Sequence, residues 1–338
     1  MQIDVWNDQE IIQINAPGGR KYAWGDKKFS SVTTILSKFE DKSFLAGWQR
    51  RVGKEESERI RDTAATHGTK THNALENHFK CYHDHLLIQE HSRLQGLSGA
   101  EQQQALVELR AKIKLDEEEE QLIQPFECLF PYIKPIALEK KIMWHDENDP
   151  SIGFGGTADA YKLVDCRLLP ANVKPLFTDG NRSYALVVLD WKNFNKKKNP
   201  IEYTRGNKYK PPTAYFPLIK YALQLSAYSA AFNKLTENKY RLNQGLLVCA
   251  YNVAPDGEPK KYELDLFHFD QRAICWFWLQ FKKMLYAYYT DGSFDWKAFC
   301  REAHQAGVLG ECLQERLLQT RCDDGEVLDF DRSLLSVS

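Results

Sequence analysis

The sequence lacks any apolar run as long as a bilayer-spanning helix requires, although 43% of its 338 residues are hydrophobic. Residues 1–8 contain neither the apolar core of a secretory signal nor the arginines of a transit peptide. A C-x-x-C pair is also missing, which argues against a zinc site built on paired cysteines. We therefore expect a soluble cytoplasmic protein with no membrane partner and with reduced, structural cysteines.

Strong net charge, internal repeats and disordered linkers are absent as well. The net charge of −1 argues against a protein that coats nucleic acid non-specifically. A chain of this length can form one large core with insertions or two modest domains. We predict a single domain over residues 1–338, with a helical insertion over 80–125 and a C-terminal extension over 295–338.

Apolar patterns along the chain alternate between strand and helix character. Residues 185–189 and 244–251 are typical of buried strands, and residues 262–269 alternate like an edge or second-sheet strand. Helical patterns cover residues 220–232 and 270–289, the latter with Asp270 as N-cap. The predicted fold class is α/β, with a mixed central β-sheet flanked by helices and carrying helical insertions.

The most informative motif is Asp190-Trp191-Lys192, at the end of the apolar strand 185–189. Side chains two positions apart in a strand point to the same face. A carboxylate there can hold a divalent metal while an ammonium orients water or stabilises charge on a phosphate. The motif alone is weak, because a surface ion pair explains most examples, but it suggests phosphodiester hydrolysis.

A second acid, Asp159, follows the glycine-rich segment 153–156. If residues 157–164 and 184–191 are antiparallel neighbours, the start of the first strand lies beside the end of the second, and Asp159 converges with Asp190. The intervening residues, including 169–172 and 178–181, have turn chemistry and predict a long hairpin loop. An alternative is that Asp159 serves only the turn chemistry after the glycines.

Two helices supply further polar groups. His72 shares a helical stripe with Ile60, Ala64, Gly68, Leu75 and Phe79, so its imidazole is expected near the core. Gln224 and Tyr228 lie at i and i+4 and share a face of the predicted 220–232 helix. Taken singly, His72 could be a hydrogen-bonded core histidine, and the Gln/Tyr pair could be ordinary packing.

Taken together and in order, these pieces resemble the PD-(D/E)XK nuclease superfamily and, within it, the RecB-type exonuclease branch, which includes phage and mitochondrial exonucleases. The matching motifs are Gly68-Thr69-x-x-His72-x-x-x-Glu76, Gly156-x-x-Asp159, Asp190-x-Lys192 and Gln224-x-x-x-Tyr228. Residues 31–36, Ser-Val-Thr-Thr-Ile-Leu, look like the N-terminal signature of phage members. The resemblance covers roughly residues 25 to 290 and implies a restriction-endonuclease-like core.

The resemblance implies a role for each matching residue. Lys192 would position the attacking water, and Gln224 and Tyr228 would brace the site or touch the nucleic-acid backbone. The implied metal ligands are His72, Asp159, Asp190 and the backbone carbonyl of Trp191. Oxygen ligands with one imidazole suit Mg²⁺ or Mn²⁺. Glu139 is expected on the preceding strand, without an assigned role.

Some relatives hold an iron–sulfur cluster, with one cysteine ahead of the histidine motif and three clustered near the C-terminus. In this chain the first cysteine, Cys81, comes after His72, and Cys300, Cys312 and Cys322 are widely spaced. We therefore expect no iron–sulfur cluster.

A basic, aromatic segment follows the D-x-K strand directly. Positive charge interleaved with aromatic rings suits a phosphate backbone and unstacked bases, although a solvated lysine-rich loop is the plain alternative. The predicted substrate-binding residues are Lys196, Lys197, Lys198, Arg205, Lys208 and Lys210.

The sequence therefore predicts a metal-dependent DNA exonuclease that favours single strands or free ends, in replication, recombination or phage genome processing, in a bacterium or a phage-infected host. An endonuclease that is structure-specific or restriction-like is the first alternative. A nucleic-acid-binding accessory protein on an inactive nuclease scaffold is the second. The presence of His72, Asp159, Asp190 and Lys192 together argues against an inactive scaffold.

Overall fold

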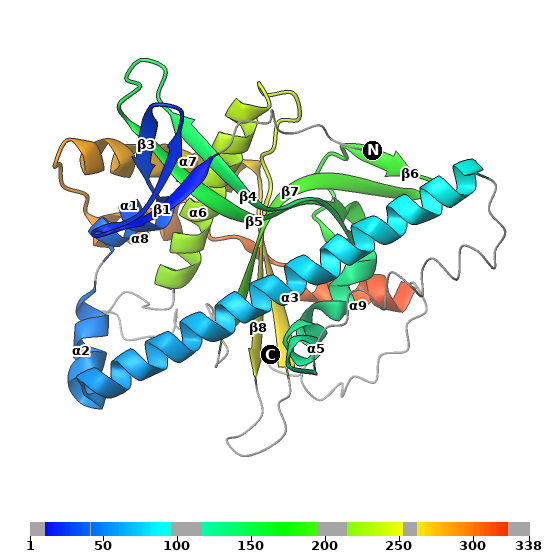
Figure 1. Cartoon of the computed structure of the whole chain (residues 1–338), viewed down its shortest axis with the longest axis horizontal. Coiled ribbons are helices and arrows are strands. Elements are labelled where there is room, and N and C mark those ends of the chain that lie inside the picture. The colour runs from blue at the N-terminus through cyan, green and yellow to red at the C-terminus, as the bar shows by residue number, and fades with distance from the viewer. Residues whose placement is uncertain (1–10, 41, 96–116, 195–214, 253–261, 324–338) are drawn as a thin grey trace.

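The computed structural model of the chain describes residues 11–40, 42–95, 117–194, 215–252 and 262–323 (Figure 1). One large mixed sheet carries helices on its faces, and a smaller three-stranded sheet lies near the N-terminus. This arrangement confirms the predicted α/β fold with a mixed central sheet flanked by helices. In the part of the chain that the structure describes, no helix is both long and apolar enough to cross a bilayer.

The large sheet has the strand order β10-β9-β8-β7-β5-β4, and the short β6 also pairs with β7. Strands β7 and β8 are parallel, whereas their other neighbours are antiparallel. Parallel neighbours need a crossover connection, and the helix α6 (Tyr215–Leu235) lies between these two strands in the sequence. The strands are β4 (Ile133–His145), β5 (Gly153–Asp165), β6 (Phe177–Asp179), β7 (Arg182–Phe194), β8 (Gly245–Asn252), β9 (Tyr262–Phe269) and β10 (Glu311–Cys312).

Both faces of β7 are covered, which explains its unbroken apolar run. Leu186 and Val188 pack into one core, and Val187 and Leu189 pack into a second core. A strand buried on both faces has no reason to alternate apolar with polar residues. The first core includes residues of α1 (Val32–Phe39), α6, α7 (Gln271–Tyr289) and α8 (Trp296–Gln305). The second includes residues of α3 (Lys54–Gln95), α5 (Glu117–Ile123), η1 (Gln124–Tyr132), η2 (Cys166–Leu168) and α9 (Gln314–Asp323).

The long helix α3 runs diagonally across the sheet in Figure 1. The apolar stripe predicted for it is only half realised, because Leu75 and Phe79 are buried whereas Ala64 is exposed. Residues 80–95 continue α3 without a break, and α5 follows at Glu117. Residues 96–116 lie outside the described residues, so the predicted insertion over 80–125 stays a prediction.

The N-terminal strands β1 (Ile12–Ala16), β2 (Gly19–Trp24) and β3 (Lys27–Ser30) form the small antiparallel sheet. It packs against the glycine-rich start of β5, where a Cβ at Gly155 would collide with Tyr22. Ser31, which follows β3, forms an isolated parallel bridge with Gly155. These glycines therefore let a second sheet lie directly on β5. The helix α2 (Ser43–Val52) then leads into α3.

Three regions differ in detail from the sequence prediction. The loop predicted between β5 and β7 contains a strand, because β6 pairs with β7 with Thr178 opposite Ser183. Residues 262–269 form β9 within the main sheet, between β8 and β10. The C-terminal extension contains the helices α8 and α9, and its unexpected element is the two-residue β10, which pairs with β9. The helix predicted over 270–289 begins as expected, with Asp270 accepting a hydrogen bond from the Ala273 amide.

Candidate active site

The site lies at a fork where β5 and β7 part. Their pairing ends with Ala160 opposite Leu189, and Asp159 and Asp190 are the next residue on each strand. The Trp191 amide donates a 3.1 Å hydrogen bond to Asp159 Oδ2 instead of to a backbone carbonyl of β5. The predicted antiparallel pairing and the convergence of the two aspartates are both confirmed.

Lys192 and Asp190 form a close ion pair within the fork. Lys192 Nζ lies 2.6 Å from Asp190 Oδ2 and 3.8 Å from Asp159 Oδ2, and it also donates to the Trp191 carbonyl at 3.0 Å. Asp190 and Lys192 share a face, as their spacing of two on β7 requires. The lysine is thereby held between both carboxylates.

Burial and the neighbouring charges act in opposite directions on the protonation of this pair. Burial raises the pKa of the Asp190 carboxyl, while the ammonium of Lys192 acts in the opposite direction. Burial alone would lower the pKa of Lys192, but Asp190 and Asp159 outweigh it and raise that pKa. Lys192 is therefore a firmly protonated cation, suited to orient a ligand and unsuited to act as a base.

His72 reaches the fork from α3. Its Nε2 lies 3.2 Å from the Trp191 carbonyl, and its Nδ1 lies 3.5 Å from both Glu139 Oε1 and Asp159 Oδ2. A carbonyl oxygen only accepts, so this contact favours a hydrogen on Nε2 and leaves the Nδ1 lone pair facing the carboxylates. Burial opposes protonation of His72, but Asp159 and Glu139 prevail and raise its pKa.

Glu139 completes the group, although the sequence analysis assigns it no role. The flanking pairs Leu138 with Ala160 and Lys140 with Ala158 place it beside Asp159. Its backbone has φ of 44°, in the left-handed region that a non-glycine residue rarely adopts. Among the described residues, His72, Glu139 and Asp159 form the one group whose ligand atoms all lie within 4.8 Å of one another and could hold a metal. The sequence signal for Glu139 is the strand-like run 137–144. Antiparallel pairing of that run with β5 brings Glu139 beside Asp159.

Asp190 stands next to this group and is not one of its three members. Its oxygens are engaged by Lys192 and by Gln224, whose Nε2 lies 3.3 Å from Oδ1. The Trp191 carbonyl likewise accepts from Lys192 and faces His72. The metal-ligand roles predicted for Asp190 and Trp191 therefore stay predictions, while His72 and Asp159 lie together as expected.

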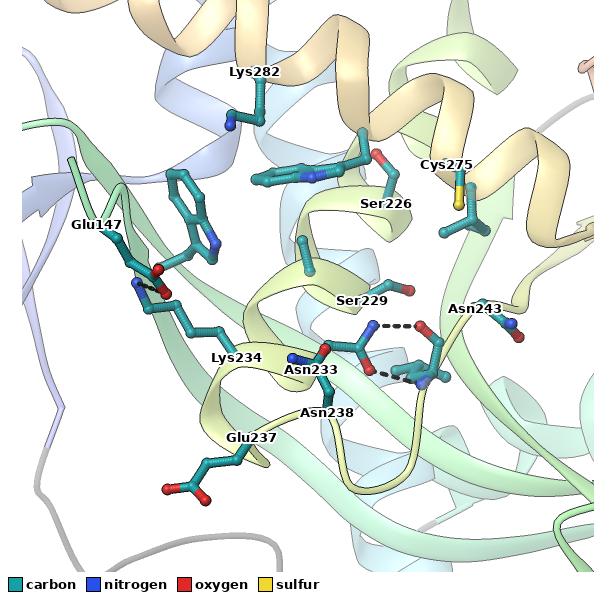
Figure 2. Close-up of a pocket in the computed structure, with 15 residues that line it drawn as sticks. Glu147, Ser226, Ser229, Asn233, Lys234, Glu237, Asn238, Asn243, Cys275 and Lys282 are labelled. Carbon is teal, nitrogen blue, oxygen red and sulfur yellow. Dashed lines mark hydrogen bonds and ion pairs between the residues drawn. The ribbon is translucent and has the colours of Figure 1, made fainter. Parts of the chain in front are cut away.

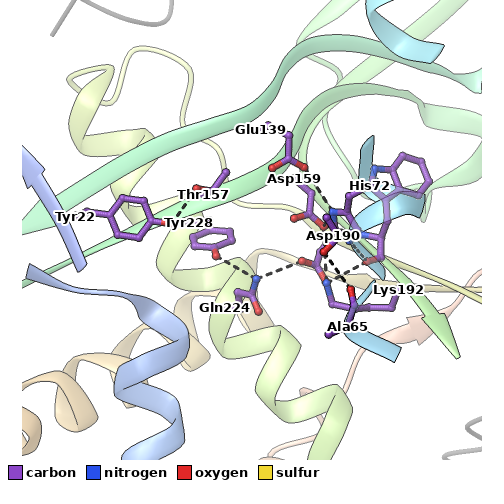
Figure 3. A network of polar contacts seen from close by, with 12 residues as sticks. Tyr22, Ala65, His72, Glu139, Thr157, Asp159, Asp190, Lys192, Gln224 and Tyr228 are labelled. Atoms are coloured by element: carbon purple, nitrogen blue, oxygen red, sulfur yellow. Dashed lines mark hydrogen bonds and ion pairs between the residues drawn. The ribbon is translucent and has the colours of Figure 1, made fainter. Parts of the chain in front are cut away.

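The helix α6 presents two different faces. Gln224 Nε2 donates to Tyr228 Oη at 3.1 Å and to Asp190, as the predicted i, i+4 spacing requires (Figure 3). Close packing holds Tyr228 in place, because a Cβ at Gly156 would lie 2.6 Å from its ring. Ser226, Ser229 and Asn233 lie on another side of the helix and line a separate pocket of about 510 Å³ (Figure 2).

The predicted basic segment follows β7 directly in the sequence. Lys196, Lys197, Lys198, Arg205, Lys208 and Lys210 lie outside the described residues, between β7 and α6. Their predicted role in substrate binding stays a prediction. The described part of the site is thus the His72, Glu139 and Asp159 group that could hold a metal, the aspartate–lysine pair and the Gln/Tyr pair.

No known family model matches the sequence, and no curated protein is significantly similar to it. The chemistry of the site therefore has to be inferred from its residues and their geometry.

Proposed function

We propose that this chain is a metal-dependent deoxyribonuclease with a restriction-endonuclease-like core, resembling the RecB-type exonucleases of the PD-(D/E)XK superfamily. The main support is the convergence of Asp159, Asp190 and Lys192 where β5 and β7 part, with His72 and Glu139 beside them. A strongly polar, partly buried group of this kind is costly for a fold and marks functional sites.

The donor set fits a hard divalent cation. Two carboxylates and one imidazole, from Glu139, Asp159 and His72, suit Mg²⁺ or Mn²⁺. The raised pKa of His72 reflects negative charge crowded around it, which a cation would neutralise. When bound, such an ion makes a water more acidic and stabilises charge on a phosphate.

The surrounding residues position the reactants. Lys192 stays protonated beside Asp190, so it can donate to an attacking water or to a phosphate oxygen. Gln224 fixes Asp190 and is itself fixed by Tyr228. The aspartate–lysine pair is thereby pre-oriented before substrate arrives, which reduces the reorganisation that the reaction requires.

The preference for single strands and free ends rests on two predicted features. The helical insertion predicted over 80–125 is expected to close over a threaded strand, and the predicted basic segment before α6 is expected to grip it; residues 96–116 and 195–214 of these segments lie outside the described residues. A closed path admits a strand only from its end. The proposed context is replication, recombination or phage genome processing, with DNA as partner and Mg²⁺ or Mn²⁺ as cofactor.

The test uses end-labelled linear and covalently closed circular single-stranded DNA of one sequence, with Mg²⁺, Mn²⁺ or chelator. Linear DNA is expected to be shortened in either metal, while the circle resists. Asp159→Ala and Asp190→Ala are expected to abolish cleavage. Asp179→Ala on β6 is the matched control, because it removes an exposed carboxylate that pairs with Lys134.

Each result has a defined meaning. Rapid nicking of the circle supports the endonuclease alternative. DNA binding without cleavage in any metal supports an accessory protein on an inactive scaffold. Near wild-type cleavage by the Asp159→Ala/Asp190→Ala variant contradicts the site assignment.

A further inference from the structure

A polar groove lies beside the small N-terminal sheet, away from the group that could bind a metal. It occupies about 530 Å³ between the β1–β2 turn, the helix α1 and the residue before α2. Its polar lining consists of Arg20, Thr33, Thr34, Ser37, Lys38 and Lys42, with Tyr288 of α7 at one side. No carboxylate lines it within the described residues.

The groove is strongly positive. Arg20 and Lys42 are exposed there, and Lys38 is held in place by Asp291 at 3.1 Å and by the Tyr288 carbonyl at 3.3 Å. After the Lys38–Asp291 pair is counted as neutral, two positive charges remain in the lining. Hydroxyl groups between cations suit a phosphate, which accepts several hydrogen bonds at once.

Close packing of the β1–β2 turn against α1 shapes the groove. Gly19 has φ of 120°, and a Cβ there would lie 2.7 Å from Thr34 Oγ1, so the β1–β2 turn packs directly on α1. Ser31 caps α1 by accepting from the Thr34 amide at 3.0 Å. The amides of the first turn of α1 also favour an anion, as a supplement to the basic side chains.

The groove is connected to the candidate active site through β5. Ser31 bridges Gly155, which lies four residues before Asp159 on the same strand. At about 3.3 Å per residue, Gly155 lies on the order of 13 Å from Asp159 along β5, a distance that a few nucleotides of single strand span. In Figure 1, α1 and the small sheet lie at one end of β5.

We propose that this groove binds a backbone phosphate of the DNA strand, a few nucleotides from the candidate active site. The inference rests on the proposed function and adds a specific contact to it. Recognition is by charge and hydrogen bonding to phosphate, so it is independent of base sequence. The groove anchors the strand, and the residues at the fork carry out cleavage.

The test compares the wild-type chain with Arg20→Ala/Lys42→Ala, which leaves Lys38 and its contacts intact. Lys174→Ala/Lys239→Ala is the matched control, because it removes two exposed charges outside the groove. Binding of fluorescent single-stranded oligonucleotides is measured by anisotropy over a range of KCl concentrations, with Ca²⁺ in place of Mg²⁺. Cleavage by each variant is measured at saturating DNA.

The groove variant is expected to bind an oligonucleotide of about fifteen nucleotides roughly tenfold more weakly at low salt. The slope of log affinity against log salt should decrease by about 0.7 for each phosphate that the variant no longer neutralises. A dinucleotide has a single bridging phosphate and cannot reach both places, so the KM for its cleavage at the fork should be nearly unchanged. Arg20→Lys should retain most of the affinity, and the cleavage rate at saturation should remain near wild type.

Affinity and salt slope equal to wild type would overturn the inference, as would an equal loss in the control variant. A second result would also overturn the inference. If inorganic phosphate, at constant ionic strength, binds the wild-type chain but not the groove variant while both bind the oligonucleotide equally, the groove is a site for free anions. A wild-type chain that cleaves DNA while the groove variant binds normally refutes the groove alone. A wild-type chain that neither binds nor cleaves DNA refutes the proposed function as well.

Discussion

The backbone amide of Trp191 donates a 3.1 Å hydrogen bond to the carboxylate of Asp159 across the fork between β7 and β5. The carboxylate takes the place of the next backbone acceptor just where the strand ladder stops. Asp159 therefore has two separate roles. It accepts the last backbone hydrogen bond at the end of the strand pairing, and its charged carboxylate forms part of the group with His72 and Glu139. The two roles can be separated by substitution.

Asp159→Asn is expected to leave the fold intact and to weaken metal binding. The amide oxygen of asparagine still accepts from Trp191, but the negative charge is lost. The Mg²⁺ concentration for half-maximal cleavage should rise about 10–100-fold, with little change in melting temperature. Metal titrations with thermal melts check this, and Asp179→Asn on β6 is the control. A similar metal requirement in both variants would contradict the assignment.

Lys192→Ala is expected to separate chemistry from binding. Lys192 is one positive charge held by two carboxylates, so DNA affinity should change less than about threefold while the single-turnover rate falls about 100-fold or more. Lys220→Ala is the control, because that lysine of α6 pairs with Glu40 and not with the aspartates at the fork. Parallel losses of affinity and rate would make Lys192 an ordinary backbone contact.

Glu139→Gly tests whether Glu139 contributes metal binding through its carboxylate although its left-handed backbone conformation costs stability. Glycine adopts φ of 44° without the cost of about 1 kcal/mol that other residues bear, so the variant should be as stable as wild type or slightly more stable. Its metal affinity should nevertheless fall. The control Lys140→Gly removes a neighbouring side chain from β4 and should destabilise the fold. Chemical denaturation and metal titration measure the two effects.

Lys162→Met is expected to stabilise the protein, and more so at low pH. The Lys162 side chain is fully buried, its ammonium nitrogen lies 3.1 Å from the centre of the Phe79 ring, and it has no hydrogen-bond partner among the described residues. Burial lowers its pKa well below the usual value. The unfolded chain therefore binds a proton that the folded chain does not, and wild-type stability declines as pH falls from the unfolded pKa towards the folded one.

The slope of this decline is about 1.4 kcal/mol per pH unit between those two pKa values. The methionine variant lacks this contribution, so the gap between the two proteins should widen as the pH falls from the unfolded pKa of the lysine towards its lowered folded pKa. Denaturation at several pH values measures it, and Lys174→Met, at an exposed position, is the control. A constant gap would mean that Lys162 stays charged in the fold.

The parts of the site that the sequence predicted depend on short-range geometry. The period of two in β7 puts Asp190 and Lys192 on one face, and the i, i+4 spacing puts Gln224 beside Tyr228. Antiparallel pairing of the neighbouring strands then brings Asp159 to Asp190. These relationships need little knowledge of the rest of the fold.

Other parts depend on tertiary contacts that no local pattern reveals. The position of Glu139 beside His72 and Asp159 depends on its backbone conformation and on the position of α3. Ala64 is exposed although the apolar spacing of α3 continues through it, so the spacing alone does not determine which residues of the helix are buried. The strand β10 has two residues, too few for any alternating pattern, and its pairing with β9 fixes it.

The contact between His72 and Trp191 joins residues 119 positions apart, and Gln224 comes later still. Contacts of such long sequence separation form slowly, because the intervening chain must first lose its freedom. During synthesis, a chain whose α6 segment has not yet left the ribosome cannot place Gln224 and Tyr228 at the site. It also lacks the crossover that brings β8 beside β7. If the proposed function is correct, a growing polypeptide should lack nuclease activity until well over half of it has left the ribosome, which would spare the DNA of the cell that makes it.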